Sequence, residues 1–319
     1  MYNYTSHVNM LNDNNRMYFY NEKIRKNKNI RNKTCCDIGS GTGILALFAL
    51  HAGAKHVYLI EEQAQMNKVI VALMNENNIN ENKYTIINEL SNKVELPEKV
   101  DIIIHELIGI WGNGEQGLSY VCDFRDRFLI DGGLIIPNIV EVHITLQNNN
   151  DLYKKKHNTQ PFLNDILFNN CLNTLHSVSN NYAHYCLNRQ IDIKNDDRYY
   201  IQNTSDCNIE IIKYDLMNDK KSDIDNLTKL CVFKPNTNII VSLLSTVKYY
   251  CNTDPHIYGD SYSNHGNWEK QIIPFKPVTH DVIYGTINIK NNNRSSNKSL
   301  ISISLIHDKI NILNCNFST

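Results

Sequence analysis

Apolar runs alternate with longer helical patterns between residues 34 and 104. Runs typical of buried strands end at Asp37, Ile60 and Ile104, and a helical pattern occupies residues 63–77. A strand that is apolar on both faces is typical of a parallel sheet with helices on both sides. The alternation therefore predicts an α/β domain built on a parallel sheet.

The pattern changes after Pro137, where an alternation of Val, Ile and Thr over residues 139–146 predicts the first strand of an all-β section. Residues 148–200 are polar, with one helical patch at 162–175. Further short β runs are expected at residues 209–214, 230–233, 239–250, 271–275, 282–289 and 300–305. Short strands separated by turn-rich stretches predict a β barrel or sandwich.

The expected organisation has three parts. Residues 1–33 are polar with a helical tendency, residues 34–137 form the α/β domain, and residues 138–319 form the β domain. A chain of 319 residues is long enough to bury such cores without disulfides.

Composition narrows the class of protein. The charged fraction is 20%, and 32 basic residues balance 33 acidic ones, so no overall field favours nucleic acid or a membrane as a partner. The nine cysteines include no C-x-x-C pair, which favours reduced thiols, and no Cys/His cluster has metal-ligand spacing. The first residues lack an apolar signal segment, and no apolar run approaches the roughly 18 residues of a membrane span. We expect a cytoplasmic or nuclear protein that binds no metal.

A glycine-rich turn follows the first strand of the α/β domain. Asp37 ends that strand, Gly39, Gly41 and Gly43 form the turn, and Glu61 ends the second strand. Glycines allow a tight turn and close approach of a ligand to the main chain, and the acid is placed to bind two ribose hydroxyls. The third glycine comes one residue too early for the dinucleotide fingerprint G-x-G-x-x-G. The turn resembles the nucleoside-binding turn of class I S-adenosylmethionine (SAM) methyltransferases; an ordinary turn or another nucleotide site is the alternative.

Two glutamates, Glu106 and Glu115, occupy the segment after the strand that ends at Ile104. A guanidinium is planar and cationic, and its N–H groups match carboxylates in pairs, so two carboxylates beside a SAM site could hold one and aim a nitrogen at the methyl group. The alternative is that Glu106 caps a loop and Glu115 begins a helix, where acids are favoured. That helix is expected over residues 118–128, closed by Asp131-Gly132-Gly133.

These segments together resemble the protein arginine methyltransferases. His7-x-x-Met10-Leu-x-Asp-x-x-Arg16 resembles a segment of that family, and Asp37-Ile-Gly-Ser-Gly-Thr-Gly is similar to its first motif. Glu106 and Glu115 reproduce its two-glutamate loop with a spacing of nine, and residues 132–137 look like its G-G-L-I-x-P turn. The resemblance is dense over residues 7–147 and faint over 228–305.

The resemblance implies a Rossmann-like SAM-binding domain, covered by residues 1–33 as a helical lid and followed by a β barrel. A helical dimerisation arm is inserted in the barrel, for which residues 148–200 have the right position. The implied cofactor-binding residues are His7, Arg16, Asp37, Gly39, Gly41, Gly43, Glu61, Ser91 and Asn92. In the family, the arginine that corresponds to Arg16 binds the SAM carboxylate, and Ser91 and Asn92 correspond to the positions that hold adenine. Met10 corresponds to a methionine near the transferred methyl group, and Glu106 and Glu115 to the catalytic glutamates.

Departures from the family pattern concern the substrate. The threonine-histidine-tryptophan loop reads Gly266-Asn267-Trp268, with His265 two positions before Asn267. We expect His265, Asn267 and Trp268 to face the substrate, and Trp111 to stack on it or to serve as ordinary packing. The loop between the glutamates resembles the symmetric-dimethylating subclass whereas Met10 is typical of asymmetric dimethylators, so the product class stays open.

The expected function is transfer of a methyl group from SAM to a guanidino nitrogen of arginine in a protein, by a homodimer. Free arginine or a small guanidino metabolite is the alternative substrate. A second alternative is a catalytically inactive scaffold with the same fold, although a scaffold has no physical need for Arg16, Asp37, Glu61, Glu106 and Glu115 together.

Overall fold

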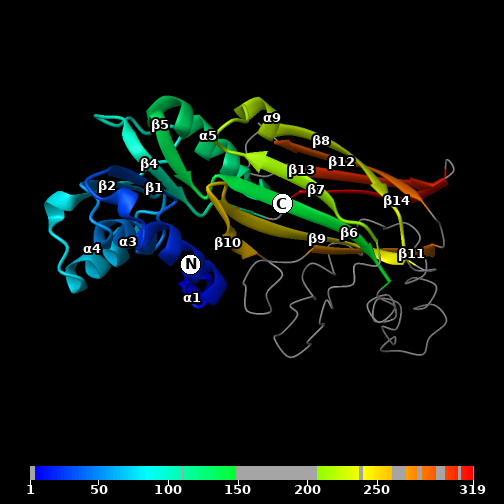
Figure 1. Cartoon of the computed structure of the whole chain (residues 1–319), viewed down its shortest axis with the longest axis horizontal. Helices are drawn as coiled ribbons and strands as arrows, with labels where there is room; N and C mark the ends of the chain where they lie inside the picture. Colours follow the sequence, from blue (N-terminus) through cyan, green and yellow to red (C-terminus); the bar gives the residue numbers. More distant parts are fainter. Residues whose placement is uncertain are drawn as a thin grey trace. The chain divides into compact units, whose positions relative to one another are not determined.

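The chain is described by a computed structural model (Figure 1), which covers residues 4–109, 111–148, 207–236, 240–260, 271–278, 282–291, 299–307 and 310–318. It divides into two compact units. The first comprises Met1–Val142, Lys213–Asp225 and Val247–Glu269, and the second His143–Ile212, Asn226–Thr246 and Lys270–Thr319. The domain boundaries expected from sequence stay a prediction.

The N-terminal part is helical. Its elements are α1 (Tyr4–Leu11), α2 (Asn14–Tyr20), the π-helical turn η1 (Asn21–Arg25) and the 3-10 turn η2 (Lys28–Ile30). Asp13 caps α2, since its side chain accepts a hydrogen bond from the Arg16 amide at 3.1 Å. Because α2 buries Arg16, Phe19 and Tyr20, this helix presents a cation and two aromatic rings to the interior of the first unit.

A parallel sheet organises the first unit and confirms the predicted α/β fold. Its strands are β1 (Thr34–Ile38), β2 (His56–Ile60), β3 (Tyr84–Ile87), β4 (Val100–His105) and β5 (Leu129–Ile136), in the order β3-β2-β1-β4-β5. The helical elements between them are α3 (Ile44–His51), α4 (Met66–Glu76), η3 (Glu81–Lys83), η4 (Gly114–Gln116) and α5 (Gly117–Phe128). Figure 1 shows α3 and α4 together on one side of the sheet. Ile38 pairs with both Ile60 and His105, so β1, β2 and β4 end at the same edge.

The strand order reverses between β1 and β4, and open α/β sheets bind ligands at the carboxyl edge beside such a reversal. Asp37, Glu61 and Glu106 all lie at this edge, within or directly after the strands that carry them. The fold therefore gathers three acidic residues that are far apart in the sequence.

The prediction that Asp131-Gly132-Gly133 closes a helix is wrong. The helix α5 ends at Phe128, and the three residues lie inside β5, where the pairing with β4 shifts register. Close packing requires a glycine at position 133, because an added Cβ would lie 2.6 Å from Leu129 Cδ1 and 2.9 Å from the Asp101 carbonyl oxygen.

Antiparallel sheets follow, as the alternating pattern predicts. The strands are β6 (Ile139–Gln147), β7 (Glu210–Asp215), β8 (Asn226–Phe233), β9 (Ile240–Cys251), β10 (Asp254–Asp260), β11 (Gln271–Val278), β12 (Ile283–Asn291), β13 (Ser299–His307) and β14 (Ile310–Ser318), with a short helix α9 (Lys221–Asp225). One sheet has the order β10-β9-β6-β7, with β11 also on β9, and the other β14-β13-β12-β8. These sheets are consistent with a barrel-like domain.

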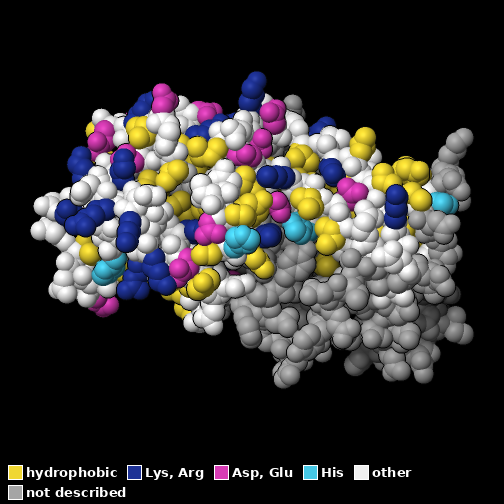
Figure 2. All heavy atoms as spheres, in the orientation of Figure 1, with side chains coloured by type: hydrophobic (Ala, Val, Ile, Leu, Met, Phe, Trp, Pro, Cys, Tyr) yellow, Lys and Arg dark blue, Asp and Glu magenta, His cyan; other side chains and the backbone are white. Residues whose placement is uncertain are grey.

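The surface in Figure 2 carries basic and acidic side chains interspersed with apolar ones, in line with the net charge of −1. None of the helices in the described ranges is both long enough and apolar enough to cross a membrane. The helical patch expected at residues 162–175, and nearly all of the segment 148–200, lie outside the described residues.

Candidate active site

The glycine turn after β1 has left-handed backbone angles that favour glycine. Gly39 has φ +71° and Gly41 has φ +50°. An added Cβ on Gly39 would lie 2.6 Å from Leu107 Cδ2, and one on Gly41 would lie 3.0 Å from His7 Cε1. The turn is therefore bounded on one side by the N-terminal helix and on the other by the segment after β4.

Asp37 is almost fully buried at the start of this turn. One carboxyl oxygen, Oδ2, accepts a hydrogen bond from the Ala46 amide at 3.1 Å, while Oδ1 is buried with no partner among the described residues. Burial, and after it the charges of Glu61 and Glu106, raises the pKa of Asp37 to about 7. A buried carboxyl oxygen in this state is suited to accept a hydrogen bond from a cationic ligand.

Glu61 lies directly after β2 and is held by the main chain. Its Oε2 accepts from the Gly41 amide and its Oε1 from the Gln63 amide, both at 2.8 Å. Each carboxylate oxygen keeps a second acceptor site, so the two together can receive a pair of neighbouring hydroxyl groups. His7 lies near by; partial burial lowers its pKa, and the charge of Glu61 opposes that shift.

Glu106 follows β4 and faces Arg16 from α2. The Arg16 guanidinium nitrogen Nη1 lies 3.5 Å from Glu106 Oε2, and Arg16 Nε lies 3.8 Å from Asp13 Oδ2. Desolvation raises the pKa of Glu106 to about 7, a shift that Arg16 opposes and Asp13 reinforces. Glu106 therefore changes charge near neutral pH, and a second cation beside it would favour its ionised form.

The residue before Glu106 anchors the end of β4. The His105 ring donates from Nε2 to the Pro137 carbonyl oxygen at 2.9 Å, and the Tyr20 hydroxyl donates to the His105 carbonyl oxygen at 2.8 Å. Complete burial lowers the pKa of His105 to about 4, so its ring is neutral at physiological pH. These contacts give His105 a structural role at the end of β4.

The loop after Glu106 is fixed by glycines and by one asparagine. Gly109 and Gly112 exchange two backbone hydrogen bonds, at 3.1 and 3.0 Å. The buried Asn113 accepts from the Leu118 amide at 3.0 Å and donates to Ser119 Oγ at 3.1 Å. We did not predict the role of Asn113 from the sequence. Its position just before α5 is a usable signal, because an asparagine there can accept a hydrogen bond from an amide in the first turn of the helix.

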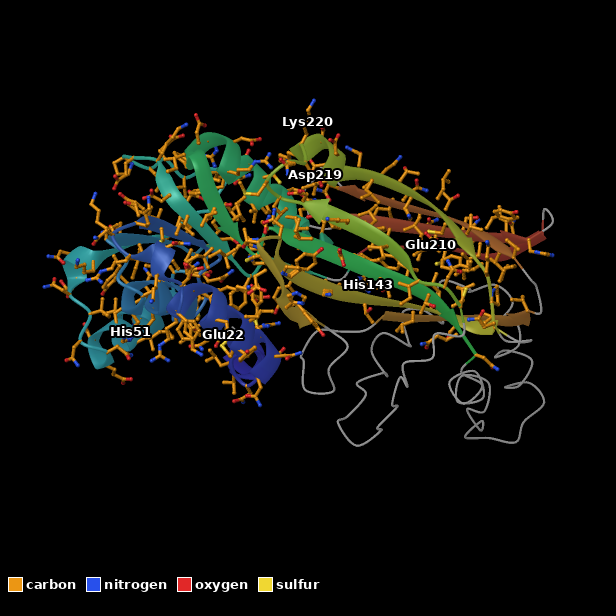
Figure 3. All side chains as sticks on the ribbon, in the orientation of Figure 1. Glu22, His51, His143, Glu210, Asp219 and Lys220 are labelled. Atoms are coloured by element: carbon orange, nitrogen blue, oxygen red, sulfur yellow. The ribbon has the colours of Figure 1, made fainter. Side chains whose placement is uncertain are left out.

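Two further helices complete the surroundings of the loop. Asn113 also donates to the Ile224 carbonyl oxygen of α9 at 3.3 Å. Arg125 of α5 donates to the carbonyl oxygens of Leu216 at 2.6 Å and of Asp219 at 2.9 Å. Asp219, labelled in Figure 3, lies just before α9. The loop is therefore tied to a segment more than 90 residues further along the chain.

The remaining expected site residues have mixed outcomes. Glu115 lies in η4, but its side chain is outside the described part of the structure, as are His265, Asn267 and Trp268. Trp111 is fully buried and its carbonyl oxygen accepts from the Tyr214 hydroxyl at 3.2 Å, which favours packing over stacking on a ligand.

Ser91 and Asn92 lie on a loop that Arg127 holds. Arg127 donates to the carbonyl oxygens of Val94 at 2.7 Å and of Ser91. Ser91 is buried, Asn92 is exposed, and Met10 of α1 is half-buried. Within the described ranges no group of three His, Cys, Asp or Glu side chains could hold a metal ion.

Comparison with known proteins relates this region to methyltransferases. Residues 20–109 match the family described as ribosomal protein L11 methyltransferase (PrmA). The chain is 41% identical over 143 residues to protein arginine N-methyltransferase 1 of Oryza sativa subsp. indica, covering 44% of this chain and 36% of the relative. It is 34% identical over 152 residues to protein arginine N-methyltransferase 1 of Schizosaccharomyces pombe, covering 47% and 44%. The matched part thus spans less than half the length of these curated relatives.

Two solved structures share the fold along almost the whole chain. Arabidopsis thaliana protein arginine methyltransferase 10 has a TM-score of 0.74 at 21% identity, covering 98% of this chain and 96% of that one. A Trypanosoma brucei enzyme–prozyme heterotetramer of protein arginine methyltransferase 1 with AdoHcy has a TM-score of 0.75 at 19% identity, covering 99% and 98%. The chain therefore has relatives among protein arginine N-methyltransferases in sequence over 44–47% of its length, and in fold along almost its whole length.

Proposed function

We propose that this chain transfers a methyl group from SAM to a guanidino nitrogen of arginine in a protein. The premise is that its fold and its sequence relatives are those of protein arginine N-methyltransferases. The observation that carries the proposal is the position of Glu106, a carboxylate beside Arg16 at the same sheet edge as Asp37 and Glu61. This edge offers acceptors for a nucleoside and, beside them, a carboxylate for a cation.

The residues at this edge fit SAM by their chemistry. The carboxylate of Glu61 would receive the two ribose hydroxyls, and the unpaired buried Oδ1 of Asp37 would accept from the ammonium group. Arg16 would pair with the carboxylate of the amino acid moiety. When bound, SAM supplies a methyl group activated by its attachment to a positively charged sulfur.

Glu106 would hold and orient the guanidinium. A guanidinium remains protonated at any physiological pH, so its approach would stabilise the ionised form of Glu106, whose pKa of about 7 leaves it partly neutral even beside Arg16. The carboxylate would then draw positive charge away from one nitrogen, and it could accept the proton lost on methylation. Glu115, nine positions on, is the proposed second carboxylate, with Met10 beside the methyl group.

Protein arginine is the proposed substrate because the curated sequence relatives are named for that activity.

We further propose that the chain works as an oligomer, with the homodimer as the first expectation, in the cytoplasm or nucleus. The oligomer is checked by light scattering coupled to size exclusion, where a mass of twice 36.9 kDa is expected and a monomeric mass would contradict the dimer.

The direct test is methyl transfer from labelled SAM, run in parallel with an arginine-rich peptide and with free L-arginine. We expect label on the peptide, lost in Glu106→Gln, and little label on free arginine. Label on free arginine alone would make the substrate a small guanidino compound. Tight SAM binding without label on either substrate would contradict the guanidino proposal and favour a scaffold.

A further inference from the structure

A cavity in the first unit is lined by residues that have no role in the proposed methyl transfer. Its volume is about 280 Å³, near the lower end of the roughly 300–1,000 Å³ typical of small-molecule sites. Its walls come from η1, from the end of β5 and from the turn between β9 and β10. None of the residues lining it belongs to the candidate active site.

The interior of the cavity is largely apolar. Ile135, Ile136 and Cys251 line it and are each buried, and Met217 contributes a flexible thioether. The mouth is polar, because Asn252 and Thr253 are exposed on the turn after β9. An aliphatic group entering from solvent would therefore exchange water for apolar side chains.

The polar groups inside the cavity are mainly donors. Lys23 is 8% exposed, and its ammonium donates to the Asp254 carbonyl oxygen at 3.0 Å and to Asp254 Oδ2 at 2.7 Å. An ammonium carries three N–H groups, so a third is left for a ligand. The side-chain oxygen Oδ1 of Asn138 accepts a hydrogen bond from the backbone amide of Asn252 at 2.9 Å. The side-chain NH₂ of Asn138 is a further donor at the wall of the cavity.

The charge of Lys23 is already balanced. Its hydrogen bond lowers the pKa of Asp254, which is therefore ionised at neutral pH. An incoming carboxylate would place a second negative charge beside Asp254, whereas a neutral carbonyl oxygen accepts from Lys23 without that repulsion. The donor-rich, charge-balanced wall favours an uncharged acceptor.

We propose that this cavity binds a small uncharged molecule with a short aliphatic chain and a carbonyl oxygen, the oxygen accepting from Lys23 and the chain packing against Ile135, Ile136 and Met217. This site is independent of the proposed methyl transfer. The probe pair is hexanamide and hexanoate, which have the same chain and differ in charge.

The test is calorimetric titration of the full chain with each probe. Hexanamide is expected to bind with a Kd of about 1 mM, as suits a ligand of its size, and hexanoate at least about threefold more weakly. Asn252→Trp, which places a large ring at the mouth, should weaken hexanamide about tenfold or more, while Asn75→Trp on the exposed face of α4 should leave it unchanged. Lys23→Met should weaken it by a similar factor because it removes the donor.

Hydrogen exchange on the same samples locates the probe. Saturating hexanamide should slow exchange at residues 23–27 and 134–138, and should not do so in Asn252→Trp. Absence of hexanamide binding to the native chain, equal binding by the two tryptophan variants, or tighter binding of hexanoate would each overturn the proposal. Since Asn252 is exposed, its variant keeps the test decisive even if Lys23→Met fails to fold.

Discussion

The glycine turn, defined as residues 37–43 with Glu61, and the glutamate loop, defined as residues 106–117, hold their charges in different ways. In the glycine turn, Asp37 and Glu61 accept hydrogen bonds from backbone amides at 2.8 to 3.1 Å. In the glutamate loop, Glu106 Oε2 lies 3.5 Å from Arg16 Nη1, and Arg16 belongs to the helix α2. The first arrangement is fixed by the main chain, whereas the second depends on a side-chain cation.

This difference separates two tasks. Backbone amides hold the acceptors of the glycine turn in place before any ligand arrives, which lowers the cost of ordering them on binding. The charge of Glu106 instead depends on nearby cations. Burial raises its pKa and Arg16 lowers it, and the result is a pKa of about 7. We therefore expect changes in the glycine turn to alter SAM affinity, and changes around Glu106 to alter turnover and its dependence on pH.

The largest expected effect is on turnover in Glu106→Gln. The amide keeps the shape of the side chain but cannot draw charge from a guanidinium, so kcat should fall about 1,000-fold. Single-turnover transfer from labelled SAM to an arginine-rich peptide measures this loss. Glu98→Gln, an exposed acid elsewhere in the first unit, is the matched control, and a fall of less than about tenfold in Glu106→Gln would contradict the assignment.

Gly117→Ala should destabilise the glutamate loop strongly. An added Cβ would lie 1.9 Å from the Leu107 carbonyl oxygen, a backbone atom that cannot rotate away, so we expect a loss of about 3 kcal/mol or more in the free energy of unfolding. Gly132→Ala is the control, since it has φ +73° with no atom within 4 Å and should cost about 1 kcal/mol from backbone strain alone. Urea denaturation compares the two, and equal losses would show that the close contact at Gly117 is unimportant.

Arg16→Met should raise the pKa of Glu106 further above its ordinary value, because the cation that opposes the shift is removed. The acidic limb of the pH profile of kcat/KM should then move upward by about one pH unit, which lowers the rate about fivefold at pH 7. Arg16→Lys keeps the charge and should move the limb less. An unshifted limb in both variants would mean that Glu106 is not the titrating group.

Asp37 should make the folded chain less stable as pH rises towards 7. Its raised pKa means that the folded state binds a proton more tightly than the unfolded state, so this stabilisation is complete below the ordinary carboxyl pKa and is lost as pH rises through about 7. In Asp37→Asn this loss should be absent, a difference of about 2–3 kcal/mol between pH 5 and pH 8. Unfolding curves at both pH values measure it, and parallel pH dependence in both chains would argue against the buried proton.

Local patterns in the sequence predicted the main elements of the first unit. The strands expected to end at Asp37, Ile60 and Ile104 are found in the structure, where they end within one residue of those positions, because a continuous apolar run is a strong signal for a buried parallel strand. The strands β5, β10 and β14 were not predicted. Residues 131–133 of β5 were expected to close a helix, Pro255 interrupts β10, and asparagines recur at positions 311, 314 and 316 of β14. Pairing partners, rather than local preference, decide such strands.

The candidate site shows the same division. Asp37, Glu61 and the glycines were predicted because their positions at strand ends are visible in the sequence. The anchors of the glutamate loop, Asn113 and Tyr20, were not, because their contacts join residues between 5 and 111 positions apart. The distant partners, His105 for Tyr20 and Ile224 for Asn113, are set by tertiary packing, for which a single sequence has no local signal. The contact of Asn113 with the Leu118 amide is local and does leave a signal in the sequence.

The most direct test of the contrast between the two regions is the dissociation constant for SAM in Glu61→Gln and Glu106→Gln, measured by calorimetry on the two variants side by side. The account predicts at least about tenfold weaker binding in Glu61→Gln, because the amide replaces one acceptor of the ribose pair with a donor. It predicts near-native binding in Glu106→Gln, where Arg16 is released to pair with the SAM carboxylate. Weak binding in Glu106→Gln with native binding in Glu61→Gln would contradict it.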